Sequence, residues 1–124
     1  LEPAVARQDS FPAVYLNLGV VRLRQRRFEE ARTLFQHALA LDPQQIMVHN
    51  NLGDLLFNEG QPAKAVEEYV AELALNPDSV VSHLHLAKAY EVLGIPDKSI
   101  EPYQAVQRMD PSNQEAKAAL QESR

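Results

Sequence analysis

Residues 12–45 read PAVYLNLGVVRLRQRRFEEARTLFQHALALDPQQ, and the landmarks of this stretch recur twice further along the chain. Pro43 is followed by Pro77 and Pro111 at successive steps of 34 residues. The same step relates further sets: Leu18, Leu52 and Leu86; Gly19, Gly53 and Ala87; Ala31, Ala65 and Ser99; Phe35, Tyr69 and Tyr103. A constant period of this length indicates stacked copies of one supersecondary unit, each too small to bury its own apolar face.

Each copy contains two stretches with helical periodicity. Apolar residues recur at spacings of three and four over residues 12–25, 29–41, 46–59, 63–75, 80–93 and 97–109. Gly60 and Gly94 stand between the two helices of a copy, where glycine can adopt the left-handed conformation of a C-cap. Each second helix ends at an Asp-Pro or Asn-Pro pair, because proline excludes its predecessor from the α conformation. The predicted fold class is therefore all-α, with antiparallel helix pairs stacked into a solenoid.

Small residues predict close packing within each helix pair. A glycine inside a helix costs about 1 kcal/mol relative to alanine, so Gly19 and Gly53 need a packing reason. Together with Ala31 and Ala65 on the partner helices, they allow two backbones to approach closely. An aromatic side chain such as Tyr69 can then fill the space beside them.

Two residues depart from the repeat in ways that affect structure. Pro102 lies inside the last long helix and should kink it or delay its start, because proline has no backbone N–H to donate. Glu72 stands where the first copy has the small Ala38, and an ion pair with Lys88 is one way to accommodate its charge.

The flanks of the three copies are also expected to be helical. Asp78 and Ser112 are good N-cap residues, and Ser112 with Glu115 makes a capping box for a seventh helix over residues 112–123. Residues 4–8 align with residues 38–42, as the tail of a preceding copy would. The expected segments are an N-terminal flank 1–11, three repeats at 12–45, 46–79 and 80–113, and a C-terminal capping or partial-repeat helix 114–124.

The composition excludes several classes of function. The 124-residue chain is 45% hydrophobic and 23% charged, which is the ordinary globular range. It has no cysteine, which excludes disulfides, thiol catalysis and Cys-ligated zinc. The net charge of −5 argues against nucleic-acid binding. Arginines nevertheless cluster early, at positions 7, 22, 24, 26, 27 and 32, which we interpret as a solvated helix end. No apolar run approaches the roughly 20 residues of a membrane span, no secretory signal is recognisable, and the localisation stays open.

The landmarks of the three copies resemble the signature of the tetratricopeptide repeat. They read Tyr15-x2-Leu18-Gly19, Ala31-x3-Phe35 and Pro43; His49-x2-Leu52-Gly53, Ala65-x3-Tyr69 and Pro77; and His83-x2-Leu86-Ala87, Ser99-x3-Tyr103 and Pro111. The resemblance covers residues 12–113 and implies a right-handed α-solenoid that holds another polypeptide. His49 and His83 replace the aromatic residue usual at their position, so we interpret them as residues at the edge of the core.

In this family the first helices line a concave groove, so the resemblance also implies which side chains face it. The expected groove residues are Leu16, Asn17, Val20, Asn50, Asn51, Asp54, Phe57, Asn58, Leu84, His85 and Lys88. The repeat step relates Asn17, Asn51 and His85, and an asparagine ladder of this kind is similar to the one in the repeats attached to O-linked N-acetylglucosamine transferases. A primary amide offers a donor and an acceptor, so it can pair with any peptide group of an extended partner.

The two-carboxylate clamp, with which related repeats grip the acidic C-terminus of a heat-shock protein, is not expected here. It requires Lys, Asn, Asn, Lys and Arg at the positions that hold Leu16, Val20, Asn51, Val81 and His85. The groove instead offers an exposed apolar strip made by Leu16, Val20, Leu23, Phe57 and Leu84. Such strips mark interfaces, and a partner helix or strand, the N-terminal segment, a second copy, or flanking repeats outside this chain would cover it.

No catalytic, metal-binding or cofactor motif accompanies the repeats, and the histidines lack the i, i+4 spacing of a metal pair. The leading hypothesis is a non-catalytic protein–protein interaction module that binds a peptide or partner protein in the concave groove. One alternative is a structural scaffold segment that self-assembles as a homo-oligomer. Another is the non-catalytic appendage of a larger enzyme such as a glycosyltransferase. The linkers and the many Ala and Gln residues hint at a bacterial origin.

Overall fold

The computed structural model describes residues 12–122, and every regular element in that range is a helix. The elements are α2 (Pro12–Arg24), α3 (Phe28–Leu41), α4 (Val48–Asn58), α5 (Pro62–Leu75), α6 (Val80–Val92), the 3-10 helix η1 (Pro96–Ser99), α7 (Ile100–Met109) and α8 (Gln114–Glu122). This confirms the predicted all-α fold, whereas the predicted N-terminal flank, residues 1–11, lies outside the described part. None of the described helices has the length and apolar character needed to cross a membrane.

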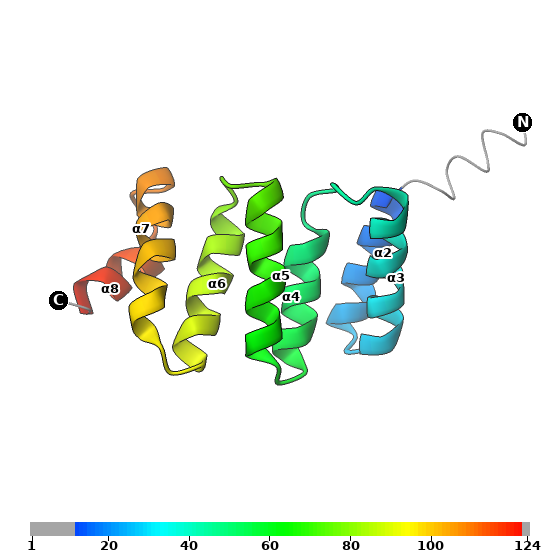
Figure 1. Cartoon of the computed structure of the whole chain (residues 1–124), viewed down its shortest axis with the longest axis horizontal. Helices are drawn as coiled ribbons and strands as arrows, with labels where there is room; N and C mark the ends of the chain where they lie inside the picture. Colours follow the sequence, from blue (N-terminus) through cyan, green and yellow to red (C-terminus); the bar gives the residue numbers. More distant parts are fainter. Residues whose placement is uncertain (1–11, 123–124) are drawn as a thin grey trace, which may run out of the picture.

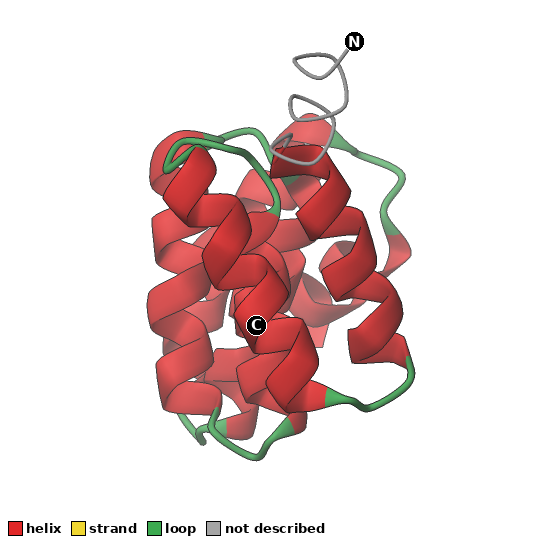
Figure 2. Cartoon of the chain, turned by 90° about the vertical axis from the view of Figure 1, so that its right-hand side faces the viewer, coloured by secondary structure: helices red, strands yellow, loops and turns green. Residues whose placement is uncertain are grey.

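The helices are stacked in chain order, so that each packs against its neighbours in sequence (Figure 1). Short loops join consecutive helices at the upper and lower edges of the stack (Figure 2). The first helices of the pairs also contact one another, α2 with α4 and α4 with α6, which places them together on one side of the stack. Three hydrophobic clusters, centred on Phe35, Tyr69 and Tyr103, follow each other along the solenoid.

The close approach predicted for the glycines is confirmed. A Cβ atom on Gly19 would lie 2.5 Å from Cε1 of Phe35, and one on Gly53 would lie 2.5 Å from Cε1 of Tyr69. Both distances are far below van der Waals contact, so only glycine lets the aromatic ring lie against the helix backbone. Phe35 and Tyr69 are buried as a result and form the centres of their clusters.

The turns within the helix pairs share one backbone conformation. Gly60 and Gly94 have φ angles of 81° and 80°, as predicted for a left-handed C-cap. The residue at the same repeat position in the first pair is Arg26, and its φ of 62° is also left-handed. A side chain at this φ is disfavoured because its Cβ approaches the neighbouring carbonyl. The first pair therefore carries a local strain that the other two avoid.

Two of the predicted helix caps are wrong by one residue. The cap of α6 is Ser79, not Asp78: the Ser79 hydroxyl accepts a 3.1 Å hydrogen bond from the N–H of Ser82. The cap of α8 is Asn113, whose Oδ1 accepts a 3.0 Å hydrogen bond from the N–H of Ala116. Ser112 instead donates to Asp110 at 3.1 Å, so the predicted capping box does not form and α8 begins at Gln114.

Pro102 was predicted to kink the last long helix or to delay its start, and the structure shows the delay. The segment after Gly94 first forms the 3-10 helix η1, and the α conformation begins only at Ile100. Pro102 thus occupies the first turn of α7, where a missing N–H costs nothing because that group has no partner within the helix. Its ring is buried, so the proline contributes to the core of the third pair.

The suggested ion pair between Glu72 and Lys88 is wrong. Lys88 lies 2.6 Å from the carboxylate of Glu115 on α8. Glu72 is fully buried, and its carboxylate accepts hydrogen bonds from the backbone N–H groups of Met47 at 2.7 Å and of Asn50 at 3.2 Å. These N–H groups belong to the start of α4, where they have no partner within the helix. A carboxylate from α5 therefore caps the neighbouring helix.

Candidate functional site

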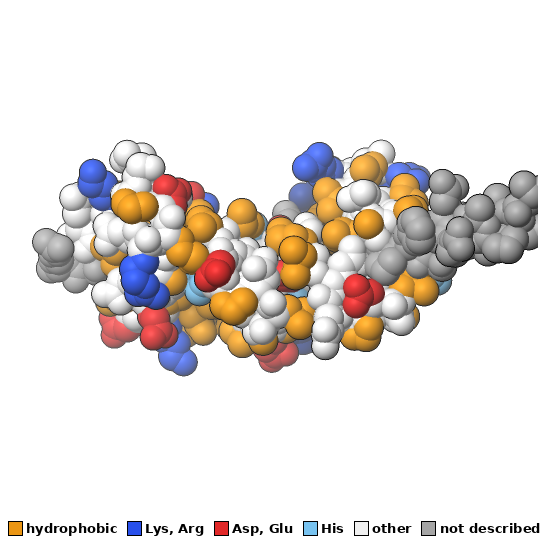
Figure 3. Space-filling view, turned by 90° about the horizontal axis from the view of Figure 1, so that it is seen from above, with side chains coloured by type: hydrophobic (Ala, Val, Ile, Leu, Met, Phe, Trp, Pro, Cys, Tyr) orange, Lys and Arg blue, Asp and Glu red, His pale blue; other side chains and the backbone are white. Residues whose placement is uncertain are grey.

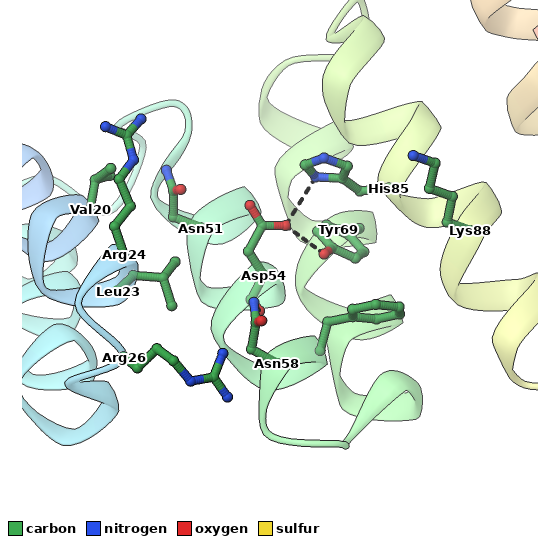
Figure 4. Close-up of a pocket in the computed structure, with 11 residues that line it drawn as sticks. Val20, Leu23, Arg24, Arg26, Asn51, Asp54, Asn58, Tyr69, His85 and Lys88 are labelled. Carbon is green, nitrogen blue, oxygen red and sulfur yellow. Dashed lines mark hydrogen bonds and ion pairs between the residues drawn. The ribbon is translucent and has the colours of Figure 1, made fainter. Parts of the chain in front are cut away.

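A cavity of about 560 Å³ opens between the first helices of the three pairs. Its walls are formed by Val20, Leu23 and Arg24 of α2 with Arg26 of the following turn, by Asn51, Asp54, Phe57 and Asn58 of α4, by Tyr69 of α5, and by His85 and Lys88 of α6. Figure 4 shows the labelled side chains around the space between the helices, with Arg26 pointing across it toward Asn58. Seen from above, the molecule is hollowed near its middle, with Lys or Arg side chains beside the hollow on the N-terminal side (Figure 3).

Asp54 lies at the centre of this groove and has two partners. The hydroxyl of Tyr69 donates a 2.6 Å hydrogen bond to its Oδ1 atom, and Nδ1 of His85 lies 3.0 Å from the same oxygen (Figure 4). The His85 contact lacks the alignment of a hydrogen bond, so the imidazole lies beside Asp54 without donating to it. Burial and the adjacent Asp54 carboxylate raise the pKa of the Tyr69 hydroxyl above its ordinary value. Tyr69 therefore acts as a fixed donor that orients Asp54.

Two asparagine side chains beside Asp54 are held by their own helix. Nδ2 of Asn51 donates to the carbonyl of Met47 at 2.8 Å, and Nδ2 of Asn58 donates to the carbonyl of Asp54 at 2.7 Å. A primary amide has a second N–H and a carbonyl oxygen beyond the bond that orients it. The groove thus contains oriented amides that can pair with the backbone of a bound polypeptide.

The apolar side chains of the groove are half-buried, and the predicted exposed strip is wrong in this respect. Leu16, Val20 and Leu23 pack against the cluster of Phe35, Phe57 packs against that of Tyr69, and Leu84 packs against that of Tyr103. Val20, Leu23 and Phe57 still line the cavity, whereas Leu16 and Leu84 do not. Hydrophobic contact to a ligand is therefore available at the walls of one pocket and not along a continuous strip.

Most of the other predicted groove residues line the cavity, but Asn17 and Asn50 do not. Seven of the residues that the resemblance implied come together at the cavity: Val20, Asn51, Asp54, Phe57, Asn58, His85 and Lys88. Asn17 is exposed but does not line it. The prediction for Asn50 is wrong, because this side chain is only 2% exposed and accepts a 2.8 Å hydrogen bond from the hydroxyl of Ser82. Asn50 therefore joins α4 to α6 in the interior.

Three groove residues were missed by the sequence patterns: Arg24, Arg26 and Tyr69. The repeat step offered a signal for Arg24, since it corresponds to the predicted Asn58. Tyr69 belongs to a second helix, and its ring was expected only to fill the core. Arg26 was hidden because its equivalents, Gly60 and Gly94, have no side chain.

The histidines outside the groove have structural partners. Nδ1 of His49 lies 2.7 Å from Oε1 of Glu68, and Nε2 of His83 lies 2.9 Å from the carbonyl oxygen of Pro77. Both side chains are half-buried, in agreement with their interpretation as residues at the edge of the core. Within residues 12–122, no three His, Asp or Glu side chains gather in a way that could hold a metal ion.

Two models described as tetratricopeptide repeat match the chain, one over residues 12–45 and the other over residues 50–114. No curated protein sequence matches it. Among solved structures, the first such domain of Spaghetti (RPAP3), bound to the HSP90 peptide SRMEEVD, is 21% identical, with a TM-score of 0.82 and 90% of each chain covered.

Two further structures have the same arrangement of helices. The first repeat domain of human RPAP3 is 20% identical, with a TM-score of 0.82, and the match covers 90% of this chain and 88% of that one. The repeat domain of Arabidopsis OM64 is 16% identical, with a TM-score of 0.81, and the match covers 91% and 93%. At these identities the likeness shows the fold alone.

Proposed function

Because the chain belongs to the tetratricopeptide repeat family, whose domains commonly mediate protein–protein interactions, we propose that it holds a peptide segment of a partner protein in the groove between α2, α4 and α6. Domains of this family are generally non-catalytic.

The cavity around Asp54 is the observation that supports this proposal. It is concave, it joins all three helix pairs, and its polar groups are oriented before any ligand arrives. Pre-oriented groups favour binding because fewer side chains must lose conformational freedom when the complex forms. Half-buried Leu23 and Phe57 supply apolar contact beside the amides, the mixture that peptide-binding grooves use for affinity and orientation.

A selection experiment tests the proposal. A display library of random 12-residue peptides is selected on the immobilised chain, and the most enriched peptide is labelled with fluorescein for anisotropy titrations. The double variant Asn51→Ala/Phe57→Ala should bind it about tenfold more weakly, because truncation removes one amide contact and one aromatic contact. Gln36→Ala, on the exposed part of α3, serves as the control and should bind unchanged. Failure to enrich any peptide, or equal affinity of the groove variant, would refute groove binding.

A second candidate function is that of a segment within a longer or self-associating solenoid. Val14, Leu18 and Val21 on α2 are 40%, 40% and 43% exposed. Their equivalents on α4, one repeat later, are Val48, Leu52 and Leu55, which are at most 8% exposed because α3 covers them. The exposed side chains of α8 at the other end of the stack are polar or small (Gln114, Glu115, Lys117, Ala118 and Gln121), as on a terminal capping helix.

Sedimentation velocity separates this candidate from the first. Association through the α2 face would raise the sedimentation coefficient with protein concentration, and Leu18→Glu would abolish that rise. A chain that remains monomeric at all concentrations and salt levels rules out self-assembly.

A further inference from the structure

We infer that Arg24 and Arg26 make one wall of the groove selective for carboxylates, so that the bound peptide carries acidic side chains. This inference rests on the proposed peptide-binding function and adds the chemical class of the partner. It draws on two independent observations: the backbone conformation of Arg26, and the way in which the charges of the first helix pair are compensated.

The backbone at Arg26 is adapted to glycine, yet the residue is arginine. Its φ of 62° matches the values of 81° and 80° at Gly60 and Gly94, one and two repeats later. A left-handed conformation is strained for any residue with a Cβ atom, and residues held in such conformations tend to occur at functional sites. The Arg26 side chain extends from the α2–α3 turn into the groove toward Asn58 (Figure 4). Its guanidinium carbon lies 5.1 Å from the centre of the Phe28 ring, a cation–π contact that limits its motion.

The arginines of the first pair fall into two groups. Those outside the groove have acidic partners: Arg22 and Arg27 both lie against Glu30, at 3.1 and 3.5 Å, and Arg32 lies 2.6 Å from Glu59. Arg24 and Arg26, which line the groove, have no acidic partner among residues 12–122. The two arginines without a counter-charge are therefore the two that a ligand would meet.

The other charged residues of the groove have partners of two kinds. Lys88 is paired with the carboxylate of Glu115 at 2.6 Å, whereas Asp54 accepts a hydrogen bond from the hydroxyl of Tyr69, which is not a counter-charge. Among the described residues that line the groove, the positive charges without an acidic partner are those of Arg24 and Arg26. An oppositely charged ligand group gains both Coulomb attraction and charge-assisted hydrogen bonds from guanidinium groups.

The positions of the two arginines favour acidic side chains over a single terminal carboxylate. Arg24 points along the upper part of α2, and Arg26 points across the lower part of the groove, with Leu23 between them (Figure 4). A peptide with acidic residues on either side of an apolar residue would meet Arg24, Leu23 and Arg26 in turn.

The test uses the same peptide selection with matched arginine variants. Wild-type chain should enrich peptides that are rich in Asp and Glu, and amidation of their C-terminus should leave affinity unchanged. Arg24→Gln/Arg26→Gln should weaken the best peptide about tenfold, and replacing that peptide's Glu with Gln should weaken wild type by a similar factor. Arg22→Gln/Arg27→Gln removes two arginines outside the groove and should bind like wild type.

Arg26→Gly provides the sharpest single substitution. It restores the residue found at the equivalent turns, so it should raise Tm while it weakens binding of the acidic peptide. A merely structural arginine would give the opposite result on stability or no result on binding. Peptides that bind through Asn51 and Phe57 but show no acidic preference would overturn the inference and leave the proposed function intact. Loss of binding on C-terminal amidation would overturn the assignment to side chains, and failure to enrich any peptide would overturn both proposals.

Discussion

The backbone N–H of Met47 donates a 2.7 Å hydrogen bond to the fully buried carboxylate of Glu72, so a side chain of α5 caps the start of α4. Met47 itself has a left-handed φ of 79°. The same carboxylate accepts from Asn50, whose side chain is bonded to Ser82 on α6. The Glu72 side chain therefore joins α5 to the start of α4, and the Asn50 side chain in turn joins α4 to α6.

Removing this carboxylate should destabilise the chain strongly. Glu72→Ala leaves one buried and one partly buried N–H group without an acceptor and creates a cavity, so the free energy of unfolding should fall by about 3 kcal/mol. Glu72→Gln keeps one acceptor oxygen and should lose about half as much. Urea unfolding followed by circular dichroism measures both, with Glu67→Ala on the exposed face of α5 as the control. A Glu72→Ala variant as stable as wild type would contradict the role of this cap.

The contact between Gly53 and Tyr69 leads to a second prediction. Gly53→Ala gains helix propensity but forces a Cβ to within 2.5 Å of the Tyr69 ring, so we expect a net loss of about 1–2 kcal/mol. The ring must move, and its hydrogen bond to Asp54 in the groove should weaken with it. Near-ultraviolet circular dichroism would report the displaced ring. Gly60→Ala is the matched control, because it meets no atoms within 4 Å and strains only the backbone.

The Tyr69 hydroxyl predicts a specific dependence on pH. Its pKa is raised in the folded chain, chiefly by burial and also by Asp54, whereas in the unfolded chain it ionises near pH 10. The stabilisation it provides is therefore complete below pH 10 and is lost above it, by about 1.4 kcal/mol per pH unit.

Tyr69→Phe should remove the fall in unfolding free energy above pH 10 that the Tyr69 hydroxyl causes. The variant should be about 1 kcal/mol less stable than wild type at pH 7, where the hydrogen bond is missing, and should approach or exceed wild type at pH 11. Unfolding in urea at pH 7, 9, 10 and 11 measures the difference. A constant gap across this range would show that the hydroxyl titrates alike in both states.

Leu18 and Leu52 occupy the same position in successive repeats, but truncating them should lower the free energy of unfolding by different amounts. Leu52 lies on the side of α4 that packs against α3 and is only 8% exposed, so Leu52→Ala should lower the free energy of unfolding by about 3 kcal/mol. Leu18 occupies the same position on α2 but is 40% exposed, so Leu18→Ala should cost about 1 kcal/mol. Equal losses in thermal or urea unfolding would mean that the exposed face of α2 is covered in solution. A segment of a longer or self-associating solenoid requires such a cover.

Much of the fold could be predicted because its signals are local and repeated. The helix ranges follow from apolar spacing, and the tight crossings follow from Gly19 and Gly53, whose only use inside a helix is close packing. The caps at Ser79 and Asn113 were each missed by one residue, since neighbouring polar residues suit the same role and only the path of the chain decides between them.

The groove was predictable in outline and not in detail. The resemblance to the family implied that Asn51, Asp54, Phe57 and His85 face one groove, and these residues line one cavity. The resemblance implied the same for Asn50, although this residue is one position further round the helix and faces the interior. A repeat consensus records which position a residue holds and not how far each helix is rotated.

The sequence by itself determined that this chain forms an array of helix pairs, because a 34-residue period of small, aromatic and proline residues has one stable solution, in which each pair buries its face on the next. Only the tertiary structure decided which charges are compensated. Ion pairs such as Arg32 with Glu59 and Lys88 with Glu115 join residues that are 27 positions apart in each case, and they depend on how the helices stack. Local pattern sets each helix, whereas the electrostatics of the groove arise from side chains that meet only after the helices have packed.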